Sequence, residues 1–311
     1  MTLTGVPGAG ADLRLRGRTF GPGHPLVMAV VNRTPDSFYA AARFDDDAGA
    51  DAAVDRAVEE GADLVDLGGV RAGRGPRVDA AEEAARVIPL VERVRARHPE
   101  LLVSVDTWRA DVARAAARAG ADLINDTWAG HDPALVEVAA EHGLGVVCSH
   151  TGGAAPRTDP LRVAYTSPQH DPGQLDDPLD AVTADVLATL RAAAARAVAV
   201  GVDPASVLVD PTHDFGKNTW HSLHLVRRTE AVVALGYPTL MAFSRKDFVG
   251  ETLGLPVEER LEGTLAATAV AAWLGARVFR AHDVLATRRV LDMVAAIRGD
   301  LAPAHAVRGL A

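Results

Sequence analysis

Eight short apolar runs, separated by amphipathic stretches, constrain the fold of this chain more than any other feature. The stretches between them carry Ala, Glu, Arg and Leu at helical spacing, and many end on a glycine, as at Gly120 and Gly143. Continuous apolar strands that alternate with amphipathic helices indicate a parallel sheet covered by helices. The runs occupy residues 26–31, 63–69, 101–106, 122–126, 144–150, 207–211, 239–244 and 277–282.

About eight strand–helix units predict an α/β protein with a single-domain (β/α)8 TIM barrel, and a doubly wound open sheet is the alternative. We expect the barrel over residues 26–298 and a C-terminal tail over 299–311. Residues 1–25 form an N-terminal extension, in which LRLRGRTFGPG predicts a short hairpin that closes the bottom of the barrel. The irregular stretch 151–177 is typical of either a lid or a disordered segment.

Charge and cysteine content exclude several classes of partner. Lys and Arg number 32 against 41 Asp and Glu, a net charge of −9, and the two signs are interleaved, which argues against nucleic acid as a partner. The one cysteine, Cys148, allows neither an internal disulfide nor a cysteine-rich metal site and fits a reducing compartment. No secretion signal or membrane-spanning stretch is evident, so we expect a soluble, cytoplasmic protein with no membrane partner.

Polar residues end nearly every apolar run at its C-terminal side. In a barrel these ends share one rim, where active sites are assembled, so the pattern predicts an enzyme. The rim residues, in chain order, are Asn32, Asp66, Asp106, Asn125, His150, Asp210, Ser244, Arg245, Lys246, Arg280 and His282.

The rim residues suggest a flat heterocyclic ligand. A carboxylate such as Asp106 or Asp210 can accept two parallel hydrogen bonds from an amidine-like edge, and the amide of Asn125 matches a donor beside an acceptor. With the ammonium of Lys246, this set suits a ring with alternating N–H and carbonyl groups. The alternative is that Asp106 and Asp210 only cap the helices that follow them.

A second group of rim residues suggests an anion site. Arg280 and His282, two residues apart in a strand, would point the same way and could hold a phosphate near the last strands. Alternatively, Arg280 pairs with a neighbouring aspartate. Asn32 could contact the same anion or a Mg²⁺ bound to it. A metal pair at His213 and Asp214 has little support.

Ordered motifs identify the chain, over roughly residues 26–297, as a member of the dihydropteroate synthase family of pterin-binding barrels. NRTPDSF, GADLVDLGG, SVDT, IND, DPTHDFGK, SRKDFVG and RAHDV resemble the family motifs and follow in the family order. The resemblance implies that para-aminobenzoate displaces diphosphate from dihydropterin-CH2-diphosphate, with Mg²⁺, to give dihydropteroate. It also implies a homodimer.

The resemblance assigns roles by motif position. Four residues are expected to hold the pterin ring. Three are expected to hold the diphosphate and its metal, with Asn32 as the metal contact. The aminobenzoate carboxylate is expected near Ser244. Phe38, which ends NRTPDSF, is expected to contact substrate, and Lys246, Asp210 and Arg280 are expected to be catalytic. The pterin set is Asp106, Asn125, Asp210 and Lys246, and the diphosphate set is Asn32, Arg280 and His282.

Departures from the family pattern concentrate in two loops and two strand ends. Residues 39–42 and 70–75 replace Ser-Asp-Gly-Gly and Glu-Ser-Thr-Arg-Pro-Gly, which in the family close over the diphosphate and order the aminobenzoate site. Ser149-His150-Thr151 replaces Met-His-Met, and DPTHDFGK replaces Asp-Pro-Gly-x-Gly-Phe-Gly-Lys. The pattern resembles the divergent second dihydropteroate synthase homologue of actinobacteria, weak or inactive in the ordinary reaction.

Three hypotheses therefore stand. The chain is an active synthase that uses Arg71 or Arg74 in place of the missing loop arginine, or a paralogue that takes another acceptor into a pocket remodelled by Ser149, His213 and Asp214. The third is a non-catalytic pterin-binding or partner protein.

Overall fold

The computed structural model describes residues 10–33, 47–158, 163–165 and 179–309. Eight parallel strands form one sheet in the order β8-β7-β6-β5-β4-β3-β10-β9. An isolated parallel bridge between Val209 and Thr239 closes the sheet into a barrel, so the open-sheet alternative is wrong. The strands are β3 (Leu26–Asn32), β4 (Leu64–Gly68), β5 (Leu102–Asp106), β6 (Leu123–Asp126), β7 (Gly145–Ser149), β8 (Val207–Asp210), β9 (Leu240–Met241) and β10 (Val278–Ala281).

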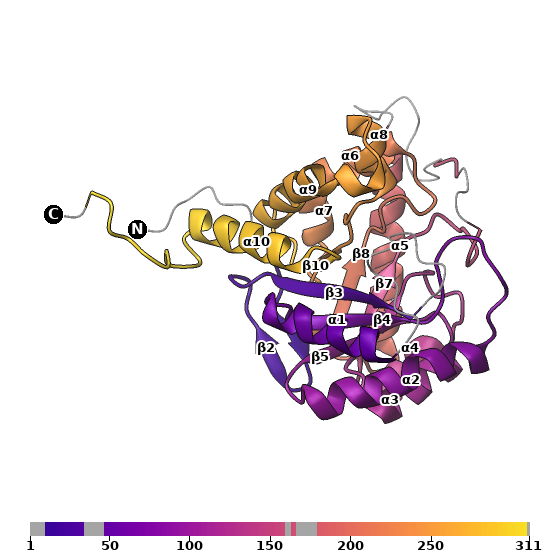
Figure 1. Ribbon diagram of the computed structural model, residues 1–311. Coiled ribbons are helices and arrows are strands. Elements are labelled where there is room, and N and C mark those ends of the chain that lie inside the picture. Colours follow the sequence, from indigo (N-terminus) through magenta and orange to yellow (C-terminus); the bar gives the residue numbers. More distant parts are fainter. Residues whose placement is uncertain (1–9, 34–46, 159–162, 166–178, 310–311) are drawn as a thin grey trace.

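Helices surround the strands, which confirms the predicted TIM barrel (Figure 1). Two helix ends show how the sequence sets their limits: α3 and α4 end on Gly120 and Gly143, whose φ values of 104° and 66° are left-handed. None of the helices in the described part of the chain is long and apolar enough to cross a membrane. The helices are α1 (Asp47–Glu59), α2 (Ala80–Arg97), α3 (Ala110–Ala119), α4 (Leu135–His142), α5 (Asp180–Ala199), α6 (Thr219–Arg227), α7 (Thr229–Val233), α8 (Asp247–Leu253), α9 (Leu261–Trp273) and α10 (Val284–Arg298).

The N-terminal hairpin plugs one end of the barrel, as the sequence predicts. Its strands β1 (Leu13–Leu15) and β2 (Arg18–Phe20) pair antiparallel. Leu13 and Leu15 are buried in one cluster with the inward-facing leucines of the barrel strands. The approach is close: a Cβ on Gly145 would lie 2.6 Å from Cδ2 of Leu15 and 2.9 Å from the backbone oxygen of Ser206, so a larger residue there would force its neighbours to shift.

Two hydrophobic cores lie on the two sides of the sheet. Successive strand side chains point to opposite faces, so alternate residues fill the barrel and the others pack against the helices. Inside the barrel lie Met28, Leu64, Leu102, Leu123, Val147, Leu208, Leu240 and Val278. This alternation determines which residues at the carboxyl end of each strand face the opening of the barrel, which we call the crater.

The chain around β9 differs from the expected strand over 239–244, because only Leu240 and Met241 form it. A turn follows, with Arg245 at φ 54°. The guanidinium of Arg245 forms two hydrogen bonds of 2.9 Å with Asp283, and Nη1 donates to the carbonyls of Val257 and Glu258. Arg245 therefore anchors the turn to the ends of neighbouring helices and is not a residue of the crater.

Beyond α10 the chain continues as an exposed coil over residues 300–309. The domain limits inferred from the sequence stay predictions.

Candidate active site at the carboxyl end of the barrel

Polar side chains occupy the last inward-facing positions of the barrel strands. On β4, buried Leu64 is followed two residues later by Asp66, and on β6 Leu123 is followed by Asn125. The parallel register then sets these side chains beside one another, because residues that are paired across strands point to the same face. The paired inward residues are Asp66 with Ser104, Asp106 with Asn125, and Ser149 with Asp210.

Arg280 on β10 joins this group into one network across the barrel. Its Nε lies 2.6 Å from Oδ2 of Asp66, and its Nη2 lies 3.2 Å from Oδ2 of Asp106. Asp66 is completely buried and also accepts hydrogen bonds from Ser104 Oγ (2.6 Å) and Asn125 Nδ2 (2.9 Å). Arg280 therefore pairs with aspartate, as the alternative interpretation of the sequence holds. The role of Arg280 in binding diphosphate stays a prediction.

Burial perturbs the ionisation of this network. Desolvation, together with the negative charge of Asp66, raises the pKa of Asp106 to about 7, although Arg280 opposes the shift. Burial and the charge of Arg280 lower the pKa of His282 to about 4. At neutral pH His282 is therefore neutral, and Arg280 carries the positive charge on this side of the crater.

A second polar group consists of Asp210 at the end of β8 and Lys246 immediately before α8. Lys246 Nζ donates to the His213 carbonyl at 2.5 Å and lies 5.0 Å from the centre of the Phe215 ring. The positive charge of Lys246 opposes the rise in the pKa of Asp210 that burial causes. The charge of Lys246 therefore acts on Asp210, and the roles of both residues in substrate binding stay predictions.

Neither Asp106 nor Asp210 caps a helix, so the capping alternative is wrong. Asp106 Oδ1 accepts a hydrogen bond from Thr127 Oγ1 at 3.1 Å. At the start of α3, the amide of Ala110 donates to the Asp132 carboxylate instead. Asp210 Oδ1 accepts the amide of Thr212 at 2.7 Å within the following turn, and α6 is capped by Asn218.

The turn after β8 keeps a glycine-like backbone at two positions, 212 and 214, where the family pattern has glycine and this chain does not. Thr212 and Asp214 have φ values of 53° and 71°, a region that β-branched residues such as Thr212 rarely enter and that aspartate enters more readily. Buried Lys217 Nζ holds the turn by donating to the carbonyls of His150 (2.8 Å), Phe215 (3.0 Å) and Thr212 (3.1 Å). The turn is therefore built by the chain's own hydrogen bonds.

His213 and Asp214 do not form the metal pair considered from the sequence. The His213 ring is fully buried, packs edge-on to Phe243 at 4.7 Å, and burial lowers its pKa well below the usual value. The Asp214 carboxylate is bonded to Ser222 Oγ and to the Phe248 amide. Among the residues that the structure describes, no three potential metal ligands of the His, Cys, Asp or Glu type lie together.

His150, which the sequence places on the rim, points away from the crater, and so does Cys148. His150 and Cys148 alternate with inward-facing Val147 and Ser149, so both face the helices. His150 Nε2 lies 2.8 Å from Oδ2 of Asp185 on α5. Burial raises the pKa of Cys148 to about 12, which agrees with the expectation that it is not a nucleophile.

An aromatic cluster borders the crater beside the altered loop 70–75. Trp128 meets Phe215 edge-on at 5.3 Å and Trp108 at 6.4 Å. Val70 and Ala72 pack against this cluster, where the family pattern has Glu and Thr. The loop therefore packs against an apolar surface, and the apolar residues Val70 and Ala72 suit that contact.

Arg157 fastens this loop to the segment after β7. Its Nη1 donates to the Pro76 carbonyl at 2.6 Å and its Nε to the Gly73 carbonyl at 3.4 Å. Arg157 itself has a φ of 63°, an uncommon value for a residue other than glycine. Arg71 and Arg74 are both exposed, and Arg71 folds back toward Gly73.

The remaining expected site residues are placed as follows. Asn32 lies at the end of β3, where its Oδ1 would be 2.8 Å from a Cβ on Gly68. Ser244 Oγ accepts the amide of His282 at 3.1 Å. Phe38 and residues 39–42 lie outside the described residues.

Sequence reasoning missed the roles of four residues that the structure brings into or beside the crater. The sequence indicates that Asp66 lies on the rim but not that its carboxylate joins Ser104, Asn125 and Arg280. Lys217 ends the motif DPTHDFGK, in which the sequence draws attention only to Asp210, His213 and Asp214. Trp128 packs against Val70 and Ala72, and Arg157 donates to the carbonyls of Gly73 and Pro76. Both contacts join segments that are far apart in the chain.

Comparison with known proteins relates the whole barrel to one family. The model of the family described as "Pterin binding enzyme" matches residues 28–282. The chain is 59% identical to the inactive dihydropteroate synthase 2 of Mycobacterium leprae (strain TN), over 96% of this chain and 99% of that protein. It is 36% identical to the dihydropteroate synthase of Bacillus subtilis (strain 168), over 88% of each.

A solved structure agrees with this relationship. The dihydropteroate synthase of Xanthomonas albilineans, determined with 4-aminobenzoic acid, is 35% identical to this chain and superimposes with a TM-score of 0.77. The match covers 93% of this chain and 98% of the other.

Proposed function

The chain belongs to the pterin-binding enzyme family, which includes the dihydropteroate synthases, and on that premise we propose that it binds a dihydropterin-CH2-diphosphate in the crater and transfers the pterin methylene to an amine. The observation that carries the proposal is the network of Arg280, Asp66, Asp106 and Asn125. It gathers a cation for the diphosphate and hydrogen-bonding groups for a heterocycle within one crater.

The ring edge would be recognised from two sides. Asp106 and Asn125 are paired across β5 and β6, so both can meet the same flat edge. Asp210 approaches from β8 beside Lys246. Ser149 adds a hydroxyl that faces the interior and is buried with no hydrogen-bond partner among the described residues, so a ligand group is its natural partner.

The proposed chemistry forms one bond and breaks one. The amine nitrogen bonds to the pterin methylene carbon, the bond from that carbon to the diphosphate oxygen breaks, and the amine proton passes to solvent. The electron-rich pterin stabilises positive charge on the methylene, while the guanidinium of Arg280 stabilises the negative charge on the leaving diphosphate. No covalent bond to the protein is needed, which is consistent with an outward-facing, un-ionised Cys148.

We propose Mg²⁺ as the metal, held chiefly by the substrate's phosphate oxygens. Asn32 fits as its protein contact because its amide oxygen lies at the end of β3, against Gly68. A single neutral oxygen suits Mg²⁺ only when phosphate supplies further ligands. The ion would neutralise the leaving diphosphate.

A second candidate function is pterin binding without transfer. The relative from Mycobacterium leprae is named an inactive dihydropteroate synthase, and in this chain Arg157 ties the loop after β4 to the segment after β7. A loop held in this way is poorly suited to the closing motion that assembles an acceptor site.

Diphosphate release decides between these functions. Purified protein with Mg²⁺ and dihydropterin-CH2-diphosphate is assayed with and without para-aminobenzoate and with a panel of other amines, using Asp210→Asn as the blank. Amine-dependent release supports a transferase. Binding of the donor with no release for any amine supports the second candidate, and no donor binding contradicts both.

We further propose a homodimer that acts in the cytoplasm. Large apolar side chains are exposed on α9 and α10, among them Val270 (47%), Met293 (62%) and Ile297 (58%). A patch of this kind is typical of an interface. Sedimentation of wild type and Met293→Glu tests it, because a dimer should dissociate in the variant and a monomeric wild type contradicts the proposal.

A further inference from the structure

Thr212 places a hydroxyl where the family pattern has glycine, in the turn that follows β8. The hydroxyl forms two hydrogen bonds: Oγ1 donates to the Asp210 carbonyl at 2.9 Å and accepts from the His150 amide at 3.1 Å. His150 directly follows β7, and Asp210 ends β8, so this one side chain joins the carboxyl ends of two neighbouring strands. A glycine at this position has no side chain to make either bond.

The hydrogen bond to His150 lies where the pairing of the two strands stops. β7 and β8 are paired as far as Ser149 and Asp210. Pro211 comes next, and a proline has no amide hydrogen with which to extend the ladder. His150 is completely buried, so without the Thr212 hydroxyl its amide would lose its partner in a place that water does not reach.

Thr212 also sets the direction of the Asp210 carboxylate. The amide of Thr212 donates to Oδ1 of Asp210 at 2.7 Å. Among the described residues no group donates a hydrogen bond to Oδ2 of Asp210, so that oxygen can meet a ligand. The carbonyl of Thr212 accepts from buried Lys217 Nζ at 3.1 Å. Every polar group of Thr212 is therefore bonded, and each bond restrains the turn next to Asp210.

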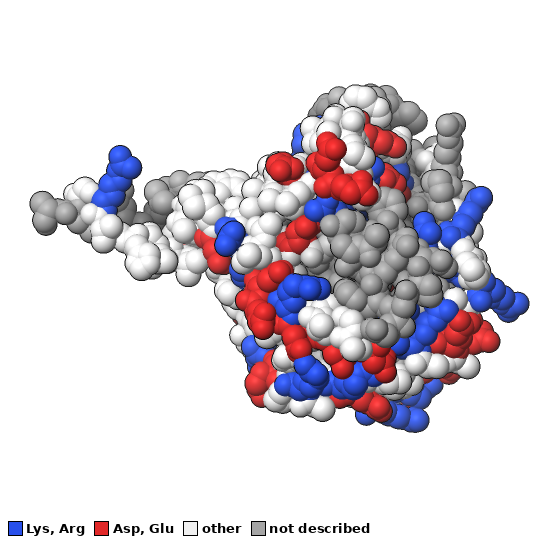
Figure 2. All heavy atoms as spheres, viewed as in Figure 1, with Lys and Arg blue, Asp and Glu red and all other residues white. Residues whose placement is uncertain are grey.

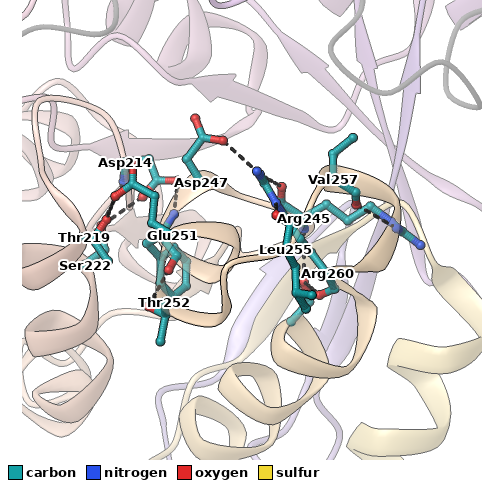
Figure 3. Close-up of polar contacts among 12 residues, drawn as sticks. Asp214, Thr219, Ser222, Arg245, Asp247, Glu251, Thr252, Leu255, Val257 and Arg260 are labelled. Carbon is teal, nitrogen blue, oxygen red and sulfur yellow. Dashed lines mark hydrogen bonds and ion pairs between the residues drawn. The ribbon is translucent and has the colours of Figure 1, made fainter.

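The far part of the same turn is held by other contacts. Asp214 accepts hydrogen bonds from Ser222 Oγ at 3.1 Å and from the Phe248 amide at 3.2 Å, and Figure 3 shows Asp214 beside Ser222. Thr212 keeps a φ of 53° that is unfavourable for a β-branched residue, and such strain persists only where surrounding contacts hold it. The bonds of Thr212 are those contacts.

We infer that Thr212 is a positioning residue, whose hydroxyl holds the Asp210 carboxylate in the orientation that recognises the pterin ring. The inference rests on the proposed function, in which Asp210 meets the edge of that ring. Thr212 ties the chain next to Ser149 to Asp210, so the buried Ser149 hydroxyl and the carboxylate form one edge of the crater. A carboxylate that is fixed before the ligand arrives loses less freedom on binding, which strengthens the binding.

Calorimetry with hydroxymethyl-dihydropterin tests the inference. This probe is uncharged, so its affinity is little affected by the acidic side chains that Figure 2 shows over α8 and α9, among them Asp247, Glu251 and Glu262. Thr212→Ala removes the hydroxyl and Thr212→Ser keeps it, and neither new side chain is β-branched. We expect Thr212→Ser to bind the probe within about twofold of wild type and Thr212→Ala to bind it about tenfold more weakly.

Two further variants separate positioning from folding. Thr212→Gly removes the hydroxyl but suits the left-handed backbone, so it should fold and still bind the probe about tenfold more weakly than wild type. Thr229→Ala is the matched control, because Thr229 is completely buried and its Oγ1 donates to the Val226 carbonyl at 2.8 Å. This control should lose stability and keep the wild-type affinity for the probe. Hydrogen exchange of the His150 amide, followed by NMR, should accelerate in Thr212→Ala and Thr212→Gly but not in Thr212→Ser.

The outcomes distinguish this inference from the proposed function. Equal affinities of Thr212→Ala and Thr212→Ser, or wild-type affinity in Thr212→Gly, would overturn the inference and leave pterin binding standing. So would an unchanged exchange rate of the His150 amide in Thr212→Gly, or an equal loss of affinity in Thr229→Ala. A wild type that does not bind the probe would overturn both the inference and the proposed function.

Discussion

The guanidinium of Arg280 on β10 lies 2.6 Å from the carboxylate of Asp66 on β4, across a strand that separates them in the sheet. Asp66 is completely buried, so this contact neutralises a charge that water cannot reach. The same guanidinium reaches Asp106 at 3.2 Å. One side chain therefore organises the floor of the crater and is also the cation expected to meet the diphosphate.

Replacing Arg280 should destabilise the free protein as well as weaken ligand binding. Arg280→Met leaves Asp66 buried without its counter-charge, and we expect a loss of about 3–5 kcal/mol in the free energy of unfolding. Urea denaturation measures this loss. The double variant Asp66→Asn with Arg280→Met should recover most of the stability, and equal losses in the single and double variants would contradict the charge argument.

Stability should depend on pH through Asp106. Its pKa is raised to about 7 in the folded protein from 3.8, so between about pH 4 and about pH 7 the folded state holds a proton that the unfolded state has lost. The free energy of unfolding contributed by this group is therefore present below this range and falls as pH rises through it. Denaturation of wild type and Asp106→Asn over this range should show a smaller fall in the variant.

Asp126 provides the control for that measurement. Burial raises its pKa to about 6, but it lies outside the crater and accepts the amides of Trp128 and Gly130. Asp126→Asn should alter the pH dependence of the free energy of unfolding only up to about pH 6, which is about one unit below the upper limit for Asp106. Identical pH profiles for the wild type and Asp106→Asn would show that Asp106 ionises normally.

Two inward-facing serines should respond differently to loss of the hydroxyl. Ser104 Oγ donates to buried Asp66 at 2.6 Å, so Ser104→Ala should cost about 1.5–3 kcal/mol of stability. Ser149 Oγ has no hydrogen-bond partner among the described residues, so Ser149→Ala should leave the stability of the free protein unchanged or raise it slightly.

The same Ser149→Ala variant tests whether this hydroxyl meets a ligand. If the pterin supplies its missing partner, affinity measured by calorimetry should fall about tenfold, a typical value for one buried hydrogen bond. Unchanged affinity would show that the hydroxyl does not contact the pterin.

Arg157 should restrain the loop after β4. Arg157→Ala removes the hydrogen bonds to the carbonyls of Gly73 and Pro76, so amide hydrogen exchange over residues 70–76 should accelerate. Arg157→Gly removes the same bonds and also suits the φ of 63°, so it serves as the control for backbone strain. No change in exchange in either variant would show that packing of Val70 and Ala72 alone holds the loop.

The amino-acid sequence by itself determined the barrel and the residues at its rim. Apolar runs bounded by helical stretches give the strand order without tertiary information, and a polar residue at a strand's carboxyl end is recognisable from its position, as Asp66 and Asp106 show. What the sequence left open was the direction of each side chain. His150 faces α5 because it is one residue from inward-facing Ser149, and a shift of one residue reverses the face.

Only the tertiary structure decided which polar groups satisfy one another. Arg280 and Asp66 are 214 residues apart, and Arg157 and Pro76 are 81 apart, so no local pattern predicts either contact. The left-handed backbone at Thr212 opposes the local preference of a β-branched residue. It persists because Lys217 donates to the Thr212 carbonyl and because Ser222 and the Phe248 amide hold the neighbouring Asp214. Local preferences set the strands and helices, whereas burial and long-range charge pairing decide the chemistry of the crater.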